Sequence, residues 1–474
     1  MRENNPYRED KEQMRELLKQ YENLKNGRSH SFLEEEAFET LIDFFLEKDD
    51  ITKAAEAAEI GCEHFPYSSL LLIKKADVLL ANRRYRDALE ILDQVSVLDA
   101  RDINIFILKT DAYLALDMHE KAVALLEEAV ASFEGEEKID LLFELADVYD
   151  DHEDFEKVFD CLQMILKEEP NNEEALHKIC FWTDFTGRNE ESIKLHKEII
   201  DEYPYNELAW FNLAAAYQGL KLYEKSIDAY QYALAIDDKF DYAYRNMGDA
   251  YIRLRKYKEA IEVLEKVTEL SKPEDVIFEA LGYCYEKLKK YAQARFYYRK
   301  ASHLRQDDSR LLYKVASTYF NENLWESCLK QLDTALQMHR LQPEYNLMAG
   351  ECKMQLGQYK EAIQFFTNVV AVRPKNTKGW EALIRCLYSI AFFEDALEQS
   401  EAAIIATGGK AIFAYYKVAT LLALGKSKEA LIQLEEAMRS QPKMLKKFVE
   451  LNPSVLQNQQ VVDVIARHKR NKSI

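Results

Sequence analysis

Apolar and small residues recur along most of this chain with a period of 34 residues. Every 34th residue counted from Ser192 has a small side chain: Ser226, Ala260, Ala294, Cys328, Ala362, Ala396 and Ala430. The residue three positions before each of these seven is aromatic, except at Ser427: Tyr223, Tyr257, Tyr291, Trp325, Tyr359 and Phe393. Chance does not keep residue classes in phase over so many periods, so the sequence predicts an array of repeats.

Each period predicts a pair of helices. When the small residue is numbered position 20, apolar or small residues occupy positions 4, 7, 8 and 11, and again positions 17, 20, 24 and 27. Spacings of three and four residues place each set on one face of a helix. Proline cannot continue a helix, and it follows the second helix at position 32 in Pro66, Pro170, Pro204, Pro374 and Pro442.

The period fits twelve times between residues 35 and 444. The predicted repeats begin at residues 35, 69, 103, 139, 173, 207, 241, 275, 309, 343, 377 and 411, with a two-residue insertion near 135–138. Residues 1–34 predict an N-terminal helix and cap, and residues 445–474 predict a C-terminal capping helix and a basic tail. Stacked repeats need such polar ends, because a terminal repeat has a neighbour on one side only.

This repeat resembles the tetratricopeptide repeat (TPR), which has the same period. The best match is 207–240, with Trp210, Leu213, Ala214, Tyr217, Tyr223, Tyr230 and Ala233 at the family positions. The resemblance implies an all-α fold, a right-handed α-α superhelix (TPR solenoid). It also implies a concave groove for proteins or peptides, lined by positions 2, 5, 6, 9, 12 and 13 of the first helices.

Charge and cysteine usage narrow the function further. The net charge is −20, with −29 in residues 1–250 and +9 in residues 251–474. An acidic chain repels phosphate backbones, which argues against nucleic acid as a partner. The 7 cysteines are scattered and never form C-x-x-C, so the sequence predicts a reducing compartment. No secretory signal or membrane span is predicted, and we expect a cytoplasmic, bacterial protein.

No catalytic constellation stands out. The 9 histidines form no H-E-x-x-H motif, and no glycine-rich phosphate-binding motif is present. We therefore expect no enzyme activity, cofactor or metal. The leading hypothesis is an adaptor or scaffold that binds peptide segments or protein surfaces in the groove. The alternative is a peptide-gated regulator that acts by compaction of the superhelix. Partner identity and oligomeric state are not predicted.

Aspartate occupies groove position 9 in four successive repeats. These residues, here called the acidic row, are Asp43, Asp77, Asp111 and Asp147, and further acids such as Glu144 and Asp184 stand near them. Stacking would place the four carboxylates about one repeat apart. Such a row favours a basic partner, and the alternative is an ordinary solvated face.

A second candidate site lies in repeats 207–342. Asn212 and Asn246 both occupy position 6, where an amide could hold the backbone of an extended peptide. Around them the groove positions hold Phe211, Tyr242, Arg245 and Tyr283, a lining suited to anchoring side chains. Asparagine is also common at this position in the family, so a purely structural role is the alternative.

Arg310 and Lys314 form a third candidate, at positions 2 and 6 of one helix. The family's carboxylate clamp has basic residues at these positions. It also needs asparagine at position 6 one repeat earlier, and lysine at position 5 with asparagine at position 9 two repeats earlier. This chain has Ala280, Arg245 and Asp249 there. The resemblance therefore implies no intact clamp, and a generic carboxylate site is what these two residues could form.

Overall fold

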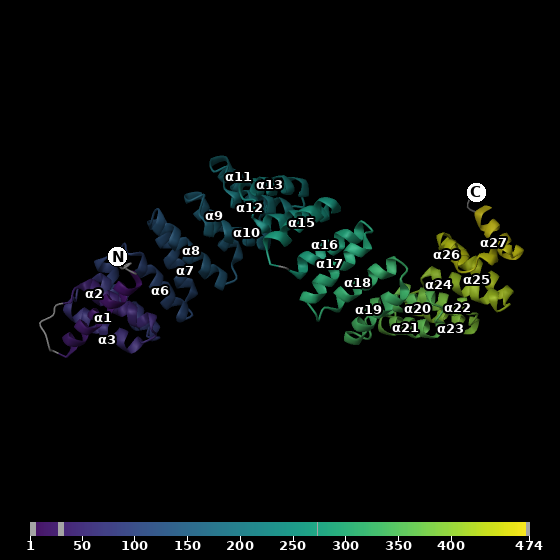
Figure 1. Ribbon diagram of the computed structural model, residues 1–474, viewed down its shortest axis with the longest axis horizontal. Helices are drawn as coiled ribbons and strands as arrows, with labels where there is room; N and C mark the ends of the chain where they lie inside the picture. The colour runs from purple at the N-terminus through teal and green to yellow at the C-terminus, as the bar shows by residue number, and fades with distance from the viewer. Residues whose placement is uncertain (1–5, 27–32, 273, 471–474) are drawn as a thin grey trace, which may run out of the picture. The chain divides into compact units, whose positions relative to one another are not determined.

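The computed structural model describes residues 6–26, 33–272 and 274–470, and the regular elements in these ranges are helices, with no strand (Figure 1). Within each part of the array described below, the two helices of a pair pack against one another, and the second helix of a pair packs against the first helix of the next pair. The predicted all-α solenoid of helix pairs is confirmed. The chain divides into two compact units, Met1–Asp238 and Lys239–Ile474, although the 34-residue period runs through this boundary unbroken.

The first unit contains an N-terminal helix followed by six helix pairs. The N-terminal helix is α1 (Pro6–Lys25). The first helices of the pairs are α2 (Glu35–Glu47), α4 (Ser69–Ala81), α6 (Ile103–Ala115), α8 (Glu136–Asp151), α10 (Glu173–Thr186) and α12 (Glu207–Gly219). Their second helices are α3 (Ile51–His64), α5 (Tyr85–Leu98), α7 (His119–Ser132), α9 (Phe155–Glu168), α11 (Asn189–Glu202) and α13 (Tyr223–Ile236).

The second unit contains six further pairs and a C-terminal cap. Its first helices are α14 (Asp241–Arg253), α16 (Asp275–Lys287), α18 (Ser309–Asn321), α20 (Pro343–Gln355), α22 (Thr377–Ser389) and α24 (Ala411–Ala423). The second helices are α15 (Tyr257–Leu270), α17 (Tyr291–Leu304), α19 (Trp325–Met338), α21 (Tyr359–Val372), α23 (Phe393–Ala406) and α25 (Ser427–Ser440).

Helix α8 begins three residues earlier than the period suggests, at Glu136 rather than residue 139. The preceding residue, Gly135, has a φ of 68° and ends the loop. Glu136 and Glu137 stand in the first turn of the helix, where negative charge is favoured by the helix dipole. The acidic insertion is thus absorbed into the helix. The other first helices of the pairs begin where the period places position 1.

Small residues at position 8 let the two helices of a pair approach closely. In α16, a Cβ atom added to Gly282 would lie 2.5 Å from Cδ1 of Tyr298 on α17. The Tyr298 side chain is fully buried, and its hydroxyl donates a hydrogen bond to Glu286 at 2.7 Å. The ring therefore fills the space that a larger residue at position 8 would occupy.

The described ends of the array are covered by additional helices. At the N-terminal end, Tyr21 of α1 is buried, and its ring lies 6.2 Å from that of Phe45 on α2. At the C-terminal end, α26 (Leu445–Leu451) packs against α24, and α27 (Gln459–Arg470) packs against α25. Phe448 of α26 is fully buried against Tyr415 of α24. The last four residues of the predicted basic tail lie outside the described residues.

Candidate functional site

The four aspartates of the acidic row lie on α2, α4, α6 and α8, and electrostatic interactions link them from repeat to repeat, through Glu144 between Asp111 and Asp147. Burial raises the pKa of the Asp77 carboxyl; the charge of Lys74 opposes this rise, and the charge of Asp43 adds to it. Although Asp111 keeps much of its surface exposed, its partial desolvation raises the pKa of its carboxyl, and the charge of Asp77 raises it further. The pKa of Glu144 on α8 is raised by burial, by Asp111 and by Asp147. The fold thus brings these carboxylates together from one repeat to the next, as stacked repeats require.

Two lysines of the chain itself neutralise the ends of this row. Lys74 on α4 places its Nζ 2.6 Å from Asp43 and 3.7 Å from Glu39. Lys178 on α10 places its Nζ 2.8 Å from Glu174 and 3.8 Å from Asp147. Between these ends lie Asp77, Asp111 and Glu144, here called the central carboxylates. Within the described part of the chain, none of the three forms an ion pair.

The central carboxylates should cost the fold some stability at neutral pH. A carboxyl whose pKa is raised on folding binds its proton more tightly when folded, so folded-state stability falls as pH rises through that range. We expect Asp111→Asn to stabilise the chain at pH 7 by up to about 0.5 kcal/mol, a small effect because solvent screens an exposed group. Urea unfolding followed by circular dichroism measures this change.

Asp43→Asn is the control for this prediction. Asp43 is ion-paired with Lys74, so its replacement removes an attraction instead of a repulsion. We expect it to leave stability unchanged or slightly lower. A lower stability of Asp111→Asn than of the unchanged chain would show that Asp111 is held by favourable contacts.

Directly after the acidic row, the chain carries a group of aromatic rings, here called the aromatic cluster: Phe155 on α9, and Phe181, Trp182 and Phe185 on α10. Phe181 occupies position 9 of α10, where the four preceding repeats have aspartate. It packs with Trp182 (ring centroids 4.9 Å apart), and Phe155 packs with Trp182 (5.3 Å) and Phe185 (4.7 Å). Phe181 and Phe185 nevertheless remain 61% and 57% exposed. Sequence reasoning missed this cluster, although groove positions 9 and 13 both hold phenylalanine here.

Asn212 is a structural residue in this fold. It lies on α12 with 2% of its surface exposed, and its Nδ2 donates a hydrogen bond of 2.7 Å to the Leu176 carbonyl oxygen on α10. The amide therefore joins two successive repeats and cannot reach a ligand. The neighbouring Phe211 packs its ring 5.6 Å from that of Tyr230. Both residues belong to the first unit, whereas the rest of this predicted set lies in the second.

In the second unit, α14 and α16 carry a more open set of predicted residues. Tyr242 is 60% exposed, and the Arg245 guanidinium lies 5.5 Å from its ring. Arg245 is itself held by Glu274 through two hydrogen bonds of 2.9 Å. Asn246 is half-buried, and its side chain has no hydrogen bond to any described residue. The Tyr283 ring has a lysine ammonium of its own helix 4.9 Å away.

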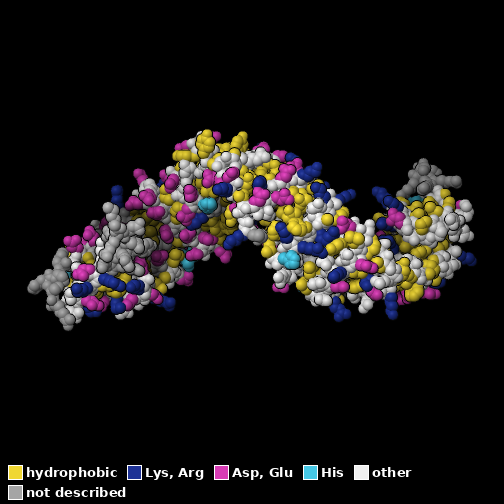
Figure 2. Space-filling model, viewed as in Figure 1, with side chains coloured by type: hydrophobic (Ala, Val, Ile, Leu, Met, Phe, Trp, Pro, Cys, Tyr) yellow, Lys and Arg dark blue, Asp and Glu magenta, His cyan; other side chains and the backbone are white. Residues whose placement is uncertain are grey.

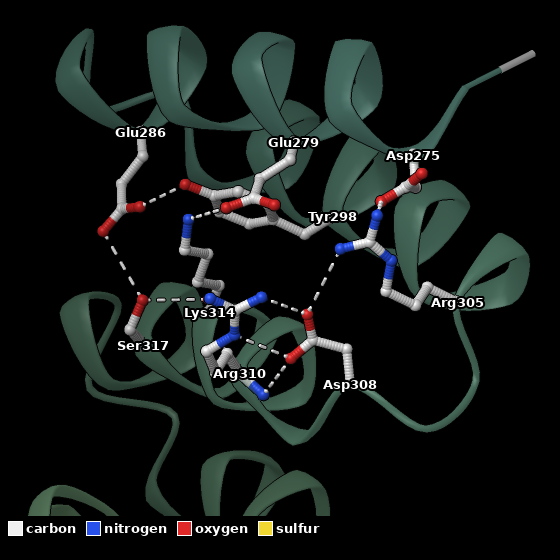
Figure 3. A network of polar contacts seen from close by, with 9 residues as sticks. All are labelled: Asp275, Glu279, Glu286, Tyr298, Arg305, Asp308, Arg310, Lys314 and Ser317. Carbon is white, nitrogen blue, oxygen red and sulfur yellow. Dashed lines mark hydrogen bonds and ion pairs between the residues drawn. The ribbon is translucent and has the colours of Figure 1, made fainter. Parts of the chain in front are cut away.

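Arg310 and Lys314 are already paired with carboxylates of the chain (Figure 3). Arg310 on α18 donates to both oxygens of Asp308, through Nε at 3.1 Å and through a terminal nitrogen at 2.8 Å. The Lys314 ammonium pairs with Glu279 on α16. A ligand carboxylate would compete with these partners for both cations, so the two side chains do not form an unpaired carboxylate receptor in this structure.

Burial shifts the pKa values of several titratable groups in the core away from neutral pH. His196 is fully buried, and burial lowers its pKa to about 4. Burial also raises the pKa of the Cys161 and Cys284 thiols to about 12. No three His, Cys, Asp or Glu side chains within the described ranges are grouped so that they could hold a metal ion. Among the described helices, none has the length and apolarity needed to cross a membrane.

Comparisons with known proteins agree with the repeat type. Residues 343–376 match a family model for the tetratricopeptide repeat, and residues 188–348 match one described as the tetratricopeptide repeat protein 21 C-terminal ARM domain. The search of curated proteins found no match. The predicted resemblance to tetratricopeptide repeats is confirmed by these models together with the observed helix pairs.

Solved structures that are similar to the chain are also described as repeat proteins or assemblies. YrrB, described as a TPR protein with an unusual peptide-binding site, is 20% identical over 40% of this chain and 96% of its own, with a TM-score of 0.36. The C-terminal part of a TPR repeat-containing protein from Cytophaga hutchinsonii is 17% identical over 54% and 98%, with a TM-score of 0.44. The Cut9–Hcn1 hetero-tetramer of APC/C is 12% identical over 82% and 97%, with a TM-score of 0.35.

Proposed function

We propose that this tetratricopeptide-type array is a protein-interaction adaptor whose first unit binds a basic, extended segment of a partner along the acidic row. The central carboxylates carry this proposal. They repel one another from repeat to repeat, and no cation of the described chain is paired with them. A lysine or arginine of a partner would relieve this repulsion on binding.

The two ends of the acidic row support basic side chains as its ligands. Each end already holds a lysine between two carboxylates, Lys74 between Glu39 and Asp43 and Lys178 between Glu174 and Asp147. A partner lysine or arginine in the centre would continue the same arrangement. The charge of −29 in residues 1–250 attracts such a segment from a distance. On the face drawn in Figure 2, acidic side chains are numerous over the helices of the first unit.

A smaller surface on α14 is a second candidate for peptide contact. Its exposed Tyr242 ring and the unbonded amide of Asn246 lie one turn apart on the same helix. An aromatic ring beside a free amide suits an apolar anchor and one backbone hydrogen bond. This surface belongs to the second unit and does not depend on the acidic row.

Binding of a hexalysine peptide tests the proposal. Titration of the full chain with the fluorescently labelled peptide should show binding that weakens as salt rises, because charges are screened beyond about 10 Å at 0.1 M ionic strength. Binding should also weaken on acidification from pH 7 to about pH 5, since carboxyls with raised pKa values lose their charge earlier than ordinary ones. The peptide lysines stay charged throughout, so the pH effect reports on the protein.

An uncharged glycine-serine peptide of the same length is the control and should not bind. If the affinity for hexalysine does not change with salt or with pH, the peptide is bound by apolar or backbone groups and not by the carboxylates. That result would contradict the proposal.

A further inference from the structure

The aromatic cluster stands at the end of the acidic row with its surface unused. Phe181 and Phe185 are more than half exposed, and no cation of the described residues lies over either ring. Large aromatic rings rarely remain exposed together on a protein surface unless they contact a partner. Lys178 indicates that this side of α10 faces the row, because it lies one turn before Phe181 and contacts Asp147 on α8.

The same region of the chain already holds cations on aromatic rings. The Lys178 ammonium lies 5.0 Å from the centre of the Phe143 ring, next to the carboxylates of Glu174 and Asp147. The Arg188 guanidinium lies 4.2 Å from the Phe159 ring and pairs with Asp160 at 2.6 Å. In both cases one cation is shared between an aromatic face and at least one carboxylate.

The aromatic cluster has the same two components, and no lysine or arginine among the described residues lies over its two exposed rings. Asp184 is exposed and lies three residues after Phe181, on the adjacent surface of α10. Asp147 occupies the same column one repeat earlier. Arginine fits such a surface better than lysine, because its planar guanidinium can stack on a ring and form two hydrogen bonds to a carboxylate at the same time.

We propose that the aromatic cluster is an arginine anchor: a partner arginine lies over the exposed Phe181 and Phe185 rings and pairs with Asp184 or Asp147. This inference rests on the proposed function, since the arginine belongs to the basic segment bound along the acidic row. It adds a specific preference that charge alone does not produce. A segment with arginine at this point binds more tightly than one of equal charge with lysine.

Measuring the affinities of the full chain for hexaarginine and for hexalysine peptides tests the arginine anchor. We expect the unchanged chain to prefer hexaarginine by about fivefold or more, which is the size of effect that cation–π contacts produce. The double variant Phe181→Leu, Phe185→Leu keeps apolar side chains and removes the rings. It should lose this preference and still bind hexalysine as before. Phe392→Leu, which changes an equally exposed ring of the second unit, should keep the preference.

The outcomes separate the anchor from the acidic row. Equal affinity of the unchanged chain for both peptides, or a preference that survives in the leucine double variant, overturns the anchor alone. Failure of both peptides to bind the unchanged chain overturns the proposed function and the anchor together. If a hexalysine peptide with one added central leucine binds as tightly as hexaarginine, the aromatic cluster is an apolar anchor and the arginine proposal is wrong.

Discussion

Replacing Tyr298 by alanine is expected to destabilise the second unit by about 3–5 kcal/mol, the usual effect of removing a large buried aromatic ring. The Tyr298 side chain is fully buried between α16 and α17, where Gly282 leaves room only for its ring. The substitution opens a cavity and leaves Glu286 without the hydrogen bond that the hydroxyl donates. Urea unfolding of the full chain measures the loss, and hydrogen exchange locates it.

The effect should be largest in the helices around the cavity, because each repeat contacts mainly its neighbours. Faster amide exchange is therefore expected in α16 and α17 first. Phe296→Ala is the matched control, since Phe296 lies on the same helix two residues earlier and is 54% exposed. We expect that variant to change stability by less than about 1 kcal/mol. Equal losses in the two variants would show that the ring of Tyr298 is not a central part of the core.

Neutralising the central carboxylates is expected to weaken binding of a basic segment by about three- to 100-fold. Each exposed charge pair contributes about 0.2–1 kcal/mol, so three together contribute about 0.6–3 kcal/mol. Every 1.4 kcal/mol is about tenfold in affinity. The triple variant is Asp77→Asn, Asp111→Asn and Glu144→Gln. Hexalysine titration at low salt measures the effect. The fold should be retained, because these groups repel one another.

A control variant removes the same charge from elsewhere in the first unit. Glu90→Gln, Glu120→Gln and Glu128→Gln change three exposed carboxylates on the second helices α5 and α7. This variant lowers the net negative charge equally but leaves the acidic row intact. We expect it to weaken binding by less than about threefold, as screening of distant charges requires. An equal loss of affinity in both triple variants would assign the binding to overall charge and not to the row.

The sequence by itself determined the helices of this protein. Periodic apolar and small residues, such as Gly282 on the first helix and Ala294 on the second, marked both helices of each pair, because a helix needs only one apolar face and a close neighbour to be stable. The turn inside each pair was harder to see. It holds a left-handed residue at position 15, where glycine occurs at Gly187, Gly357 and Gly425, but Asp49 or Lys221 adopts the same φ in other repeats. The same backbone conformation therefore recurs at position 15 even where the residue type alone does not favour it.

The acidic row could also be predicted, since stacking repeats of equal length brings the same position of each repeat into one column. The division of the chain at Asp238 could not, because the period continues across it. The accessibility of individual groove residues could not be predicted either. Asn212 and Asn246 share position 6, yet the first is buried against Leu176 and the second makes no hydrogen bond to a described residue.

Only the tertiary structure decided which charged groups are available to a ligand. Arg310 takes its partner from the loop before its own helix, at Asp308, and Lys314 takes Glu279 from the repeat before. The central carboxylates have no such partner in the described chain. Whether a charge is neutralised depends on which side chains lie within about 4 Å in space, and in a stacked array those neighbours often come from a position about 34 residues away. A linear pattern of residue types shows that a charge lies in the groove, and the packed side chains around it determine whether it is free to bind.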